Sequence, residues 1–258
     1  MSFIYSERYG SASDRPAVLF LHGLGSSSGD WQLQTPVFAA RRRVITVDLR
    51  GHGRSPAPTG LSTVEDMAGD VAALLAAWDE PPVHVVGLSL GGCVALALGL
   101  HNRARVRSLT LVNTFGRLRP AGMRGAWRML ARLGLLAVAP MPTVAAYVAG
   151  SLFPRPDQHQ LYDEAVERLG RNTRRNYLAG LQAAARFNVL HKLDRLDCPT
   201  LILAGDRDLT VPRSAAAALQ RAIPGARLRL IADCGHAMAY EQPELFNAVV
   251  GEFLEAGN

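Results

Sequence analysis

A serine between two glycines is the first group in the chain whose surroundings suggest chemistry. The apolar, strand-length run Val83–Val86 continues into Gly87-Leu-Ser89-Leu-Gly91-Gly, and a helical pattern follows at once. A serine at the apex of so sharp a turn takes a strained backbone conformation, and side chains two residues before and after it would collide with neighbouring elements. Glycine at both places therefore predicts a nucleophile elbow that holds the Ser89 hydroxyl clear of a sheet.

The same pattern also fits a glycine-rich turn that only packs a helix against a strand. In the catalytic interpretation, the backbone N–H of Leu90 lies at the N-terminus of the following helix and faces the space beside the Ser89 hydroxyl. A helix N-terminus favours negative charge, so Leu90 is a candidate donor to an oxyanion. Because a serine hydroxyl is a weak nucleophile at neutral pH, this interpretation also requires an adjacent base.

His236 is the best-placed base among the seven histidines. It follows the last predicted strand, Arg227–Ile231, in the sequence Cys234-Gly-His236. The histidines at a strand start, at a helix end or in a strand-free segment are less well placed: His84, His101, His159 and His191. An imidazole base needs a carboxylate that fixes its tautomer and stabilises its charged form. Asp206 and Asp208 both lie on the loop after the strand Thr200–Leu203, and either could supply it.

The elements that must position these groups read as alternating strands and helices. Short apolar runs recur at Ala17–Leu21, Val44–Val47, Val83–Val86, Ser108–Val112, Thr200–Leu203 and Arg227–Ile231. Most are continuously apolar, which is typical of strands buried on both faces of a parallel sheet. Helical patterns lie between several of them, and one begins with a capping box at Ser62-Thr-Val-Glu65. We expect a doubly wound, mostly parallel α/β sheet, with residues 5–9 as an antiparallel edge strand.

The alternation breaks between Asn113 and Leu196, where helical stretches are punctuated by prolines and no convincing strand occurs. We interpret this part as a helical insertion over one edge of the sheet. The prediction is a single domain of residues 1–258, with a core of 1–116 and 197–258 and a helical cap of 117–196. Neither an internal repeat nor a low-complexity linker interrupts it.

The positive charge of the chain is concentrated in that insertion. The net charge is +6, and residues 117–190 contain eleven arginines against four acidic residues, which accounts for the whole excess. Aromatic residues are not interleaved with these arginines as they are in single-strand binders, so no nucleic-acid partner is expected. Solvated helix faces would explain the arginines. A docking surface for an acidic substrate or partner is the alternative explanation.

Other classes of site and location receive no support. The three cysteines are odd in number and lack CxxC spacing, which argues against a disulfide scaffold or a zinc site. The apolar stretches are too short to span a bilayer, and residues 1–10 lack the apolar core of a secretory signal. We therefore expect a cytoplasmic protein without a membrane span, a metal or an organic cofactor.

Several stretches resemble the α/β-hydrolase superfamily. Phe20-Leu-His22-Gly23-Leu24-Gly25 resembles its oxyanion loop, and Asp48-Leu-Arg-Gly-His52-Gly-Arg-Ser resembles a turn that packs near its site. The tail from His236 through Glu241 and Pro243 resembles the end of the family's sequences. The resemblance covers nearly the whole chain outside the insertion and implies an α/β-hydrolase fold with a helical cap.

The resemblance also implies roles for individual residues. Leu24 becomes the second backbone donor to the oxyanion, beside Leu90. The family spacing Gly-x-x-Asp-x-x-x-Pro selects Asp208 as the triad acid, and Asp206 is then expected to order the turn through its own backbone bonds. His22 and His52 are expected to hold loops and not to catalyse.

The implied reaction is two-step acyl transfer from Ser89, with His236 as base and Asp208 as its partner. The expected substrate is a small-molecule carboxylic ester or lactone, carrying a negative charge or held on an acidic carrier protein. Carbon–carbon bond hydrolysis and thioester hydrolysis remain alternatives, although Leu88 departs from the asparagine frequent in carbon–carbon hydrolases. A receptor that turns over slowly is a further alternative. Ser89 and Gly25 disfavour dehalogenase and epoxide hydrolase activity.

Overall fold

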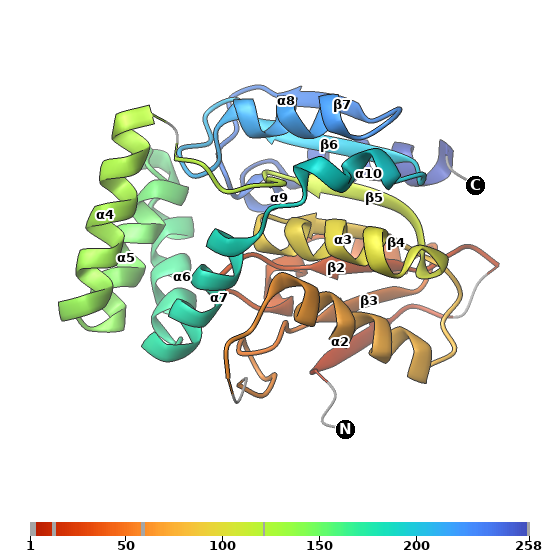
Figure 1. Cartoon of the computed structure of the whole chain (residues 1–258), viewed down its shortest axis with the longest axis horizontal. Helices are drawn as coiled ribbons and strands as arrows, with labels where there is room; N and C mark the ends of the chain where they lie inside the picture. Colours follow the sequence, from red (N-terminus) through yellow and green to blue (C-terminus); the bar gives the residue numbers. More distant parts are fainter. Residues whose placement is uncertain (1–3, 12–13, 58–59, 121, 257–258) are drawn as a thin grey trace.

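The fold is built on one twisted sheet, which a computed structural model describes for residues 4–11, 14–57, 60–120 and 122–256 (Figure 1). Within these residues seven strands form the sheet in the order β1-β3-β2-β4-β5-β6-β7. The strands are β1 (Ser6–Tyr9), β2 (Val18–Leu21), β3 (Val44–Val47), β4 (Val83–Leu88), β5 (Val106–Val112), β6 (Thr200–Gly205) and β7 (Arg227–Ile231). The predicted α/β class is confirmed.

Strand pairing is parallel everywhere except at one edge. There β1 runs antiparallel to β3, with Ser6 opposite Val47, as the edge-strand prediction required. The parallel pairs bring the carboxyl ends of β2, β4, β5 and β6 to the same edge of the sheet. Loops that follow these strands therefore meet there, which is where ligands collect in open α/β sheets.

Both faces of the sheet are covered because successive strand residues point to opposite sides. In β2, for example, Leu19 belongs to one buried cluster and Phe20 to the other. The first cluster lies under α2 (Val64–Ala77), α3 (Leu90–His101) and α8 (Arg213–Ala222). The second lies under α1 (Thr35–Ala39), α9 (Met238–Glu241) and α10 (Pro243–Ala256). This burial on two faces explains why the strands read as continuous apolar runs.

The helix α2 begins one residue later than its sequence predicted. The capping box consists of Thr63 and Asp66, not Ser62 and Glu65: Thr63 Oγ1 accepts from the Asp66 N–H at 3.0 Å, and Asp66 accepts from the Thr63 N–H at 2.9 Å. Aspartate serves as well as glutamate at the third helical position. Both pairs of residues occur in the sequence. The helix is capped by Thr63 and Asp66, and Val64, its first residue, is buried in the core.

Residues between β5 and β6 form helices at the carboxyl edge of the sheet (Figure 1). They are α4 (Gly122–Val138), α5 (Met141–Leu152), α6 (His159–Gly170) and α7 (Arg174–Arg186). An isolated antiparallel pairing of Arg117 with Asn188 joins the two ends of this part, which we call the cap. The 3-10 helices are η1 (Ser28–Trp31), η2 (Arg103–Arg105), η3 (Pro156–Gln158) and η4 (Leu190–Arg195). No helix in the described part of the chain has the length and apolarity needed to cross a bilayer.

Candidate active site

Ser89 occupies a strained turn between β4 and α3. Its φ of 53° and ψ of −113° lie outside the regions that non-glycine residues favour. The turn is held from both sides, because the Ser89 N–H donates to the Val112 carbonyl at 2.9 Å and the Ser89 carbonyl accepts from the Thr114 hydroxyl at 2.6 Å. Backbone strain persists only where the surroundings fix it in this way.

The two flanking glycines are required by close approaches of backbone. A Cβ on Gly87 would lie 2.4 Å from the Gly91 carbonyl oxygen, and a Cβ on Gly91 would lie 2.2 Å from that of Leu21. Both distances are far inside van der Waals contact. The collisions expected from the sequence are therefore present, and the second one brings the turn against the end of β2.

His236 and Asp208 meet across two loops. His236 Nδ1 lies 2.7 Å from Asp208 Oδ2, and both side chains are almost completely buried. The other carboxylate oxygen of Asp208 accepts from the N–H groups of Thr210 and Val211, at 2.7 and 3.0 Å. With Nδ1 donating to the carboxylate, Nε2 is left to accept a proton from another group.

Asp206 lies on the same loop but does not contact the imidazole. Its N–H donates to the Ile231 carbonyl at 3.0 Å, and its carboxylate accepts from the Cys234 N–H at 3.3 Å. Both bonds reach across to the segment that leads to His236. The expectation that Asp206 orders its own turn is thus replaced by a cross-loop role, because the two loops lie side by side at the sheet edge.

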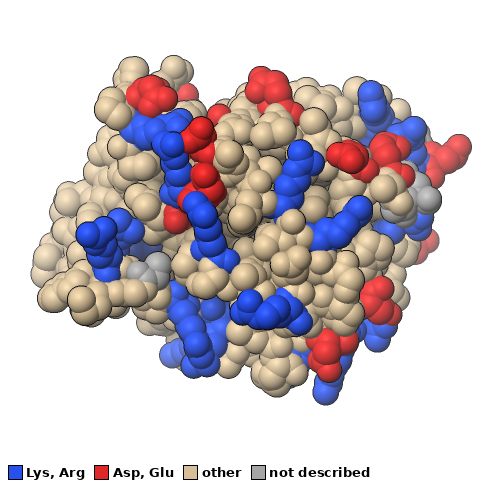
Figure 2. All heavy atoms as spheres, turned by 90° about the horizontal axis from the view of Figure 1, so that it is seen from above, with Lys and Arg blue, Asp and Glu red and all other residues tan. Residues whose placement is uncertain are grey.

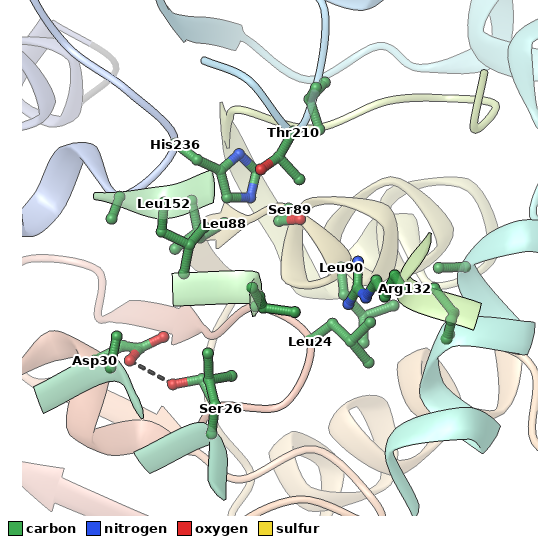
Figure 3. A pocket seen from close by; sticks show the side chains of 18 of the residues that line it. Leu24, Ser26, Asp30, Leu88, Ser89, Leu90, Arg132, Leu152, Thr210 and His236 are labelled. Atoms are coloured by element: carbon green, nitrogen blue, oxygen red, sulfur yellow. Dashed lines mark hydrogen bonds between the residues drawn. The ribbon is translucent and has the colours of Figure 1, made fainter. Parts of the chain in front are cut away.

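Ser89 and His236 line one cavity, and Figure 3 shows both side chains directed into it. The cavity has a volume of about 140 Å³ and lies between the sheet edge and the cap. Ser89 is half-buried, so its hydroxyl is accessible from the cavity. No hydrogen bond joins that hydroxyl to His236 or to any other described residue. Catalytic hydrogen bonds in unliganded enzymes often tighten only when substrate binds.

The loop after β2 lines the same cavity. His22 Nδ1 donates to the Gly23 carbonyl at 2.8 Å, because its Nε2 accepts from the Leu49 N–H at 2.9 Å. The carbonyl and the following N–H of a trans peptide point in opposite directions, so the Leu24 N–H is turned away from His22. Burial lowers the pKa of His22, which keeps the ring neutral in this role.

Leu24 and Leu90 both line the cavity beside Ser89 (Figure 3). Leu90 is the first residue of α3, whose N–H has no partner within the helix. Among the described residues neither N–H donates to another backbone carbonyl. A Cβ on Gly23 would lie 3.7 Å from that of Ser89, which measures how closely this loop approaches the serine. Backbone donors of this kind, lining the same cavity as a hydroxyl, are chemically able to bind an oxyanion.

Most of the cavity wall is apolar, but the cap contributes two arginines. Arg168 lies 3.8 Å from Asp30, whose pKa is raised by burial, and it also bonds the Tyr240 hydroxyl. Ser26 bonds the same Asp30 carboxylate (Figure 3). Arg132 of α4 bonds the Tyr177 hydroxyl and forms no ion pair with a described residue. The Arg132 Nε is buried without a hydrogen-bond partner there.

Asn113 is a residue of this site whose function the sequence did not reveal. Its side-chain amide donates to the carbonyls of Gly235 and His236 at 3.0 and 2.8 Å, and its oxygen accepts from the Gly205 N–H at 2.9 Å. One buried side chain thus joins the ends of β5 and β6 to the loop that carries His236. Its φ of 44° lies in the left-handed region, which asparagine adopts more readily than most residues do.

Glu241 is the second unpredicted contributor. Its carboxylate accepts from the Gly235 N–H at 3.0 Å and from Gln158 of the cap at 2.9 Å. Burial raises the pKa of Glu241. The sequence marked this glutamate only as part of a family-like tail, whereas its contacts connect the His236 loop to η3.

As for metals, no cluster of three or more suitable side chains occurs in the described ranges.

Comparison with known proteins gives a consistent result. A family model described as the alpha/beta hydrolase fold matches residues 16–243. A RutD protein of Caulobacter sp. strain K31, named for carbamate hydrolysis, is 33% identical over 97% of this chain and 95% of its own. The 3-oxoadipate enol-lactonase 2 of Acinetobacter baylyi is 28% identical over 95% of this chain and 91% of its own. A solved esterase of Thermogutta terrifontis aligns with a TM-score of 0.83 at 27% identity, covering 98% of this chain and 93% of its own.

Proposed function

The chain belongs to the α/β-hydrolase fold family, and from that premise we propose that it is a serine hydrolase of carboxylic esters or lactones. Ser89 is the nucleophile, His236 the base, and Asp208 the group that orients the base. The N–H groups of Leu24 and Leu90 receive the oxyanion. The observation that carries this proposal is the 2.7 Å contact of His236 with Asp208, made by a ring that shares a cavity with a strained serine.

The reaction begins when Ser89 Oγ attacks the substrate carbonyl and His236 Nε2 takes its proton. The carbonyl oxygen becomes an anion held by the Leu24 and Leu90 N–H groups, and a lost donor of this kind typically raises the barrier by about 2.7–4 kcal/mol. His236 then protonates the departing alcohol oxygen. Water, deprotonated by the same ring, attacks the acyl-enzyme and releases the acid.

A substrate that carries a carboxylate fits the cavity best. Its wall is mostly apolar, and within the described residues Arg132 has no carboxylate partner there. An arginine is the side chain best suited to bind a carboxylate through paired hydrogen bonds. Delivery of the acyl group on an acidic carrier protein would use the same excess of arginines on the cap.

Carbamate hydrolysis is the second candidate, supported by the 33% identity to a protein named for it. The same groups would act, with a carbamoyl-enzyme in place of the acyl-enzyme. Thioester and carbon–carbon bond hydrolysis would also begin with attack by Ser89. A slow ligand receptor of the same fold differs from all of these in lacking steady turnover.

Hydrolysis of p-nitrophenyl acetate by the purified chain tests the enzyme proposal. We expect steady turnover that Ser89→Ala abolishes, whereas Ser214→Ala, an exposed serine of α8, leaves it unchanged. Release of a single equivalent of p-nitrophenol would indicate the receptor instead. A panel of esters, lactones, thioesters and carbamates then ranks the substrate classes by kcat/KM.

The carboxylate preference has a separate test with a neutral ester and its carboxylated analogue. Arg132→Gln should raise KM for the carboxylated ester by about tenfold or more and change that of the neutral ester little. Arg175→Gln, an exposed arginine of α7, is the matched control. Equal salt dependence of the two wild-type rates would count against a charged substrate.

A further inference from the structure

The outward face of α4 carries a stripe of apolar side chains that no described residue covers. Its members are Met123, Trp127, Leu130, Leu133 and Val138, whose exposed fractions lie between 43% and 83%. Successive steps of four, three, three and five residues place them on one side of a helix. Figure 1 shows α4 as the outermost helix of the cap, beside α5.

The opposite face of α4 already has a packing role. Leu136 is buried in a cluster with Val144 of α5 and Tyr177 of α7, and Met129 packs against it. A surface helix of a globular protein needs one apolar stripe to face its core. A second stripe of this size on the solvent side is the mark of a binding surface.

Every charged side chain in the chain segment that carries the stripe is an arginine. From residue 113 to residue 156 the chain contains six arginines and neither aspartate nor glutamate. Arg119 and Arg124 are exposed, and like Arg128 they form no ion pair with a described residue. In Figure 2 the surface at the left edge is mostly uncharged, with Lys or Arg side chains beside it and acidic groups farther toward the upper left. A partner that binds this face must therefore present both an apolar surface and negative charge.

We propose that α4 docks the protein on the surface of a lipid bilayer that contains anionic lipids. The 17-residue helix is about 25 Å long and presents its stripe along that whole length. Such a helix lies in the plane of the interface, with Trp127 and its apolar neighbours at the headgroup–acyl boundary. The flanking arginines then meet lipid phosphates.

Other occupants fit less well. A second copy would bring two arginine-rich faces together without an acidic residue on either α4, which like-charge repulsion opposes. A protein partner would have to supply a groove for a convex helix, as helix-in-groove recognition requires. A bilayer surface needs no such shape, because the lipids adapt to the inserted side chains.

Docking would act on the site through the inner face of the same helix. Met129 and Arg132 line the cavity while Trp127 and Leu130 face outward. A docked α4 would therefore hold the cavity close to the interface, where amphiphilic esters accumulate. This consequence for the substrate rests on the proposed function, whereas the docking itself does not.

Sedimentation with vesicles tests the docking directly. We expect the wild-type chain to bind vesicles of equal parts phosphatidylglycerol and phosphatidylcholine, to bind pure phosphatidylcholine poorly, and to be released by salt. The double variant Trp127→Ser, Leu130→Ser should partition about tenfold less, because it removes the largest inserting groups. Leu230→Ser, a half-exposed leucine on β7, is the matched control and should bind as the wild type does.

The remaining outcomes decide against the proposal. Failure of the wild type to bind anionic vesicles overturns it, and so does equal binding by the double variant. A dimer that dissociates in the double variant, without vesicle binding by the wild type, would assign the stripe to a second copy.

Unchanged hydrolysis of p-nitrophenyl acetate by the double variant shows that its fold is intact. Loss of turnover in Ser89→Ala with normal vesicle binding separates this test from that of the proposed function.

Discussion

The side-chain amide of Asn113 donates a hydrogen bond to the backbone carbonyl of His236 at 2.8 Å. The same side chain holds the last residue of β6, because its oxygen accepts from the Gly205 N–H. Asn113 thus sets the separation between the strand that leads to Asp208 and the loop that presents His236. In the proposed mechanism it is a positioning residue, which never touches the substrate.

Replacing Asn113 by alanine should therefore lower kcat and leave KM nearly unchanged. Loss of these buried bonds costs about 1–3 kcal/mol, which corresponds to roughly tenfold or more in rate if it is expressed in the transition state. Steady-state kinetics with a short ester measures the split. Asn102→Ala, at the end of α3, is the control. A rise in KM alone would contradict the positioning role.

Asp208→Asn should leave the fold intact and slow turnover strongly. An amide can offer its NH₂ to His236 Nδ1, which favours the wrong imidazole tautomer and removes the negative charge that stabilises the imidazolium. In triad enzymes such a change lowers kcat by on the order of 10³–10⁴. Asp206→Asn should cost far less in kcat, because the Asp206 carboxylate contacts the Cys234 N–H and not the imidazole. Equal losses in both variants would reject the assignment of Asp208.

The stability of the fold should fall as the pH drops from about 6.5 to about 4. Burial lowers the pKa of His52 from 6.5 to about 4, so in this window the unfolded chain binds a proton that the folded chain refuses. No stability is lost through this group above pH 6.5, and the loss amounts to about 3 kcal/mol once the pH has fallen to 4.

Urea unfolding at pH 7.5 and at pH 5 measures this slope. His52→Asn keeps a donor for the Arg50 carbonyl, which Nδ1 contacts at 3.1 Å, but has no titrating ring. The variant should be less stable at both pH values and lose less stability between them. His101→Asn, an exposed histidine at the end of α3, should keep the wild-type slope. An unchanged slope in His52→Asn would show that other groups dominate.

Gly91→Ala should be among the most damaging single substitutions in the chain. A methyl group there would meet the Leu21 carbonyl oxygen at 2.2 Å, and its nearest neighbours are all backbone atoms of Leu21 and His22, which cannot rotate aside as a side chain can. We expect a loss of about 3 kcal/mol or more in the free energy of unfolding. Gly69→Ala, in the exposed interior of α2 with open space around it, should instead stabilise by up to about 1 kcal/mol. Thermal unfolding of the two variants provides the comparison.

Short-range patterns in the sequence predicted the fold and much of the site. The run from Val83 to Gly91 identified the strained turn because steric exclusion acts between residues that are close in the chain. Continuous apolar strands identified the parallel sheet for a similar reason, since burial on both faces leaves no polar positions. The capping box of α2 was misplaced by one residue because two overlapping pairs satisfy the same local rule.

The sequence by itself determined the order of the elements, the sharp turn at Ser89, and a small set of candidate base and acid residues that could act with that serine. The family-like spacing already favoured Asp208 over Asp206, and the tertiary structure adds its contact with His236. Only the tertiary structure decided that Asn113 and Glu241 hold the base loop. The same is true of the second apolar face of α4. Local spacing records steric and burial constraints along the chain, but the direction of a loop side chain depends on segments more than a hundred residues away, whose approach is set by packing.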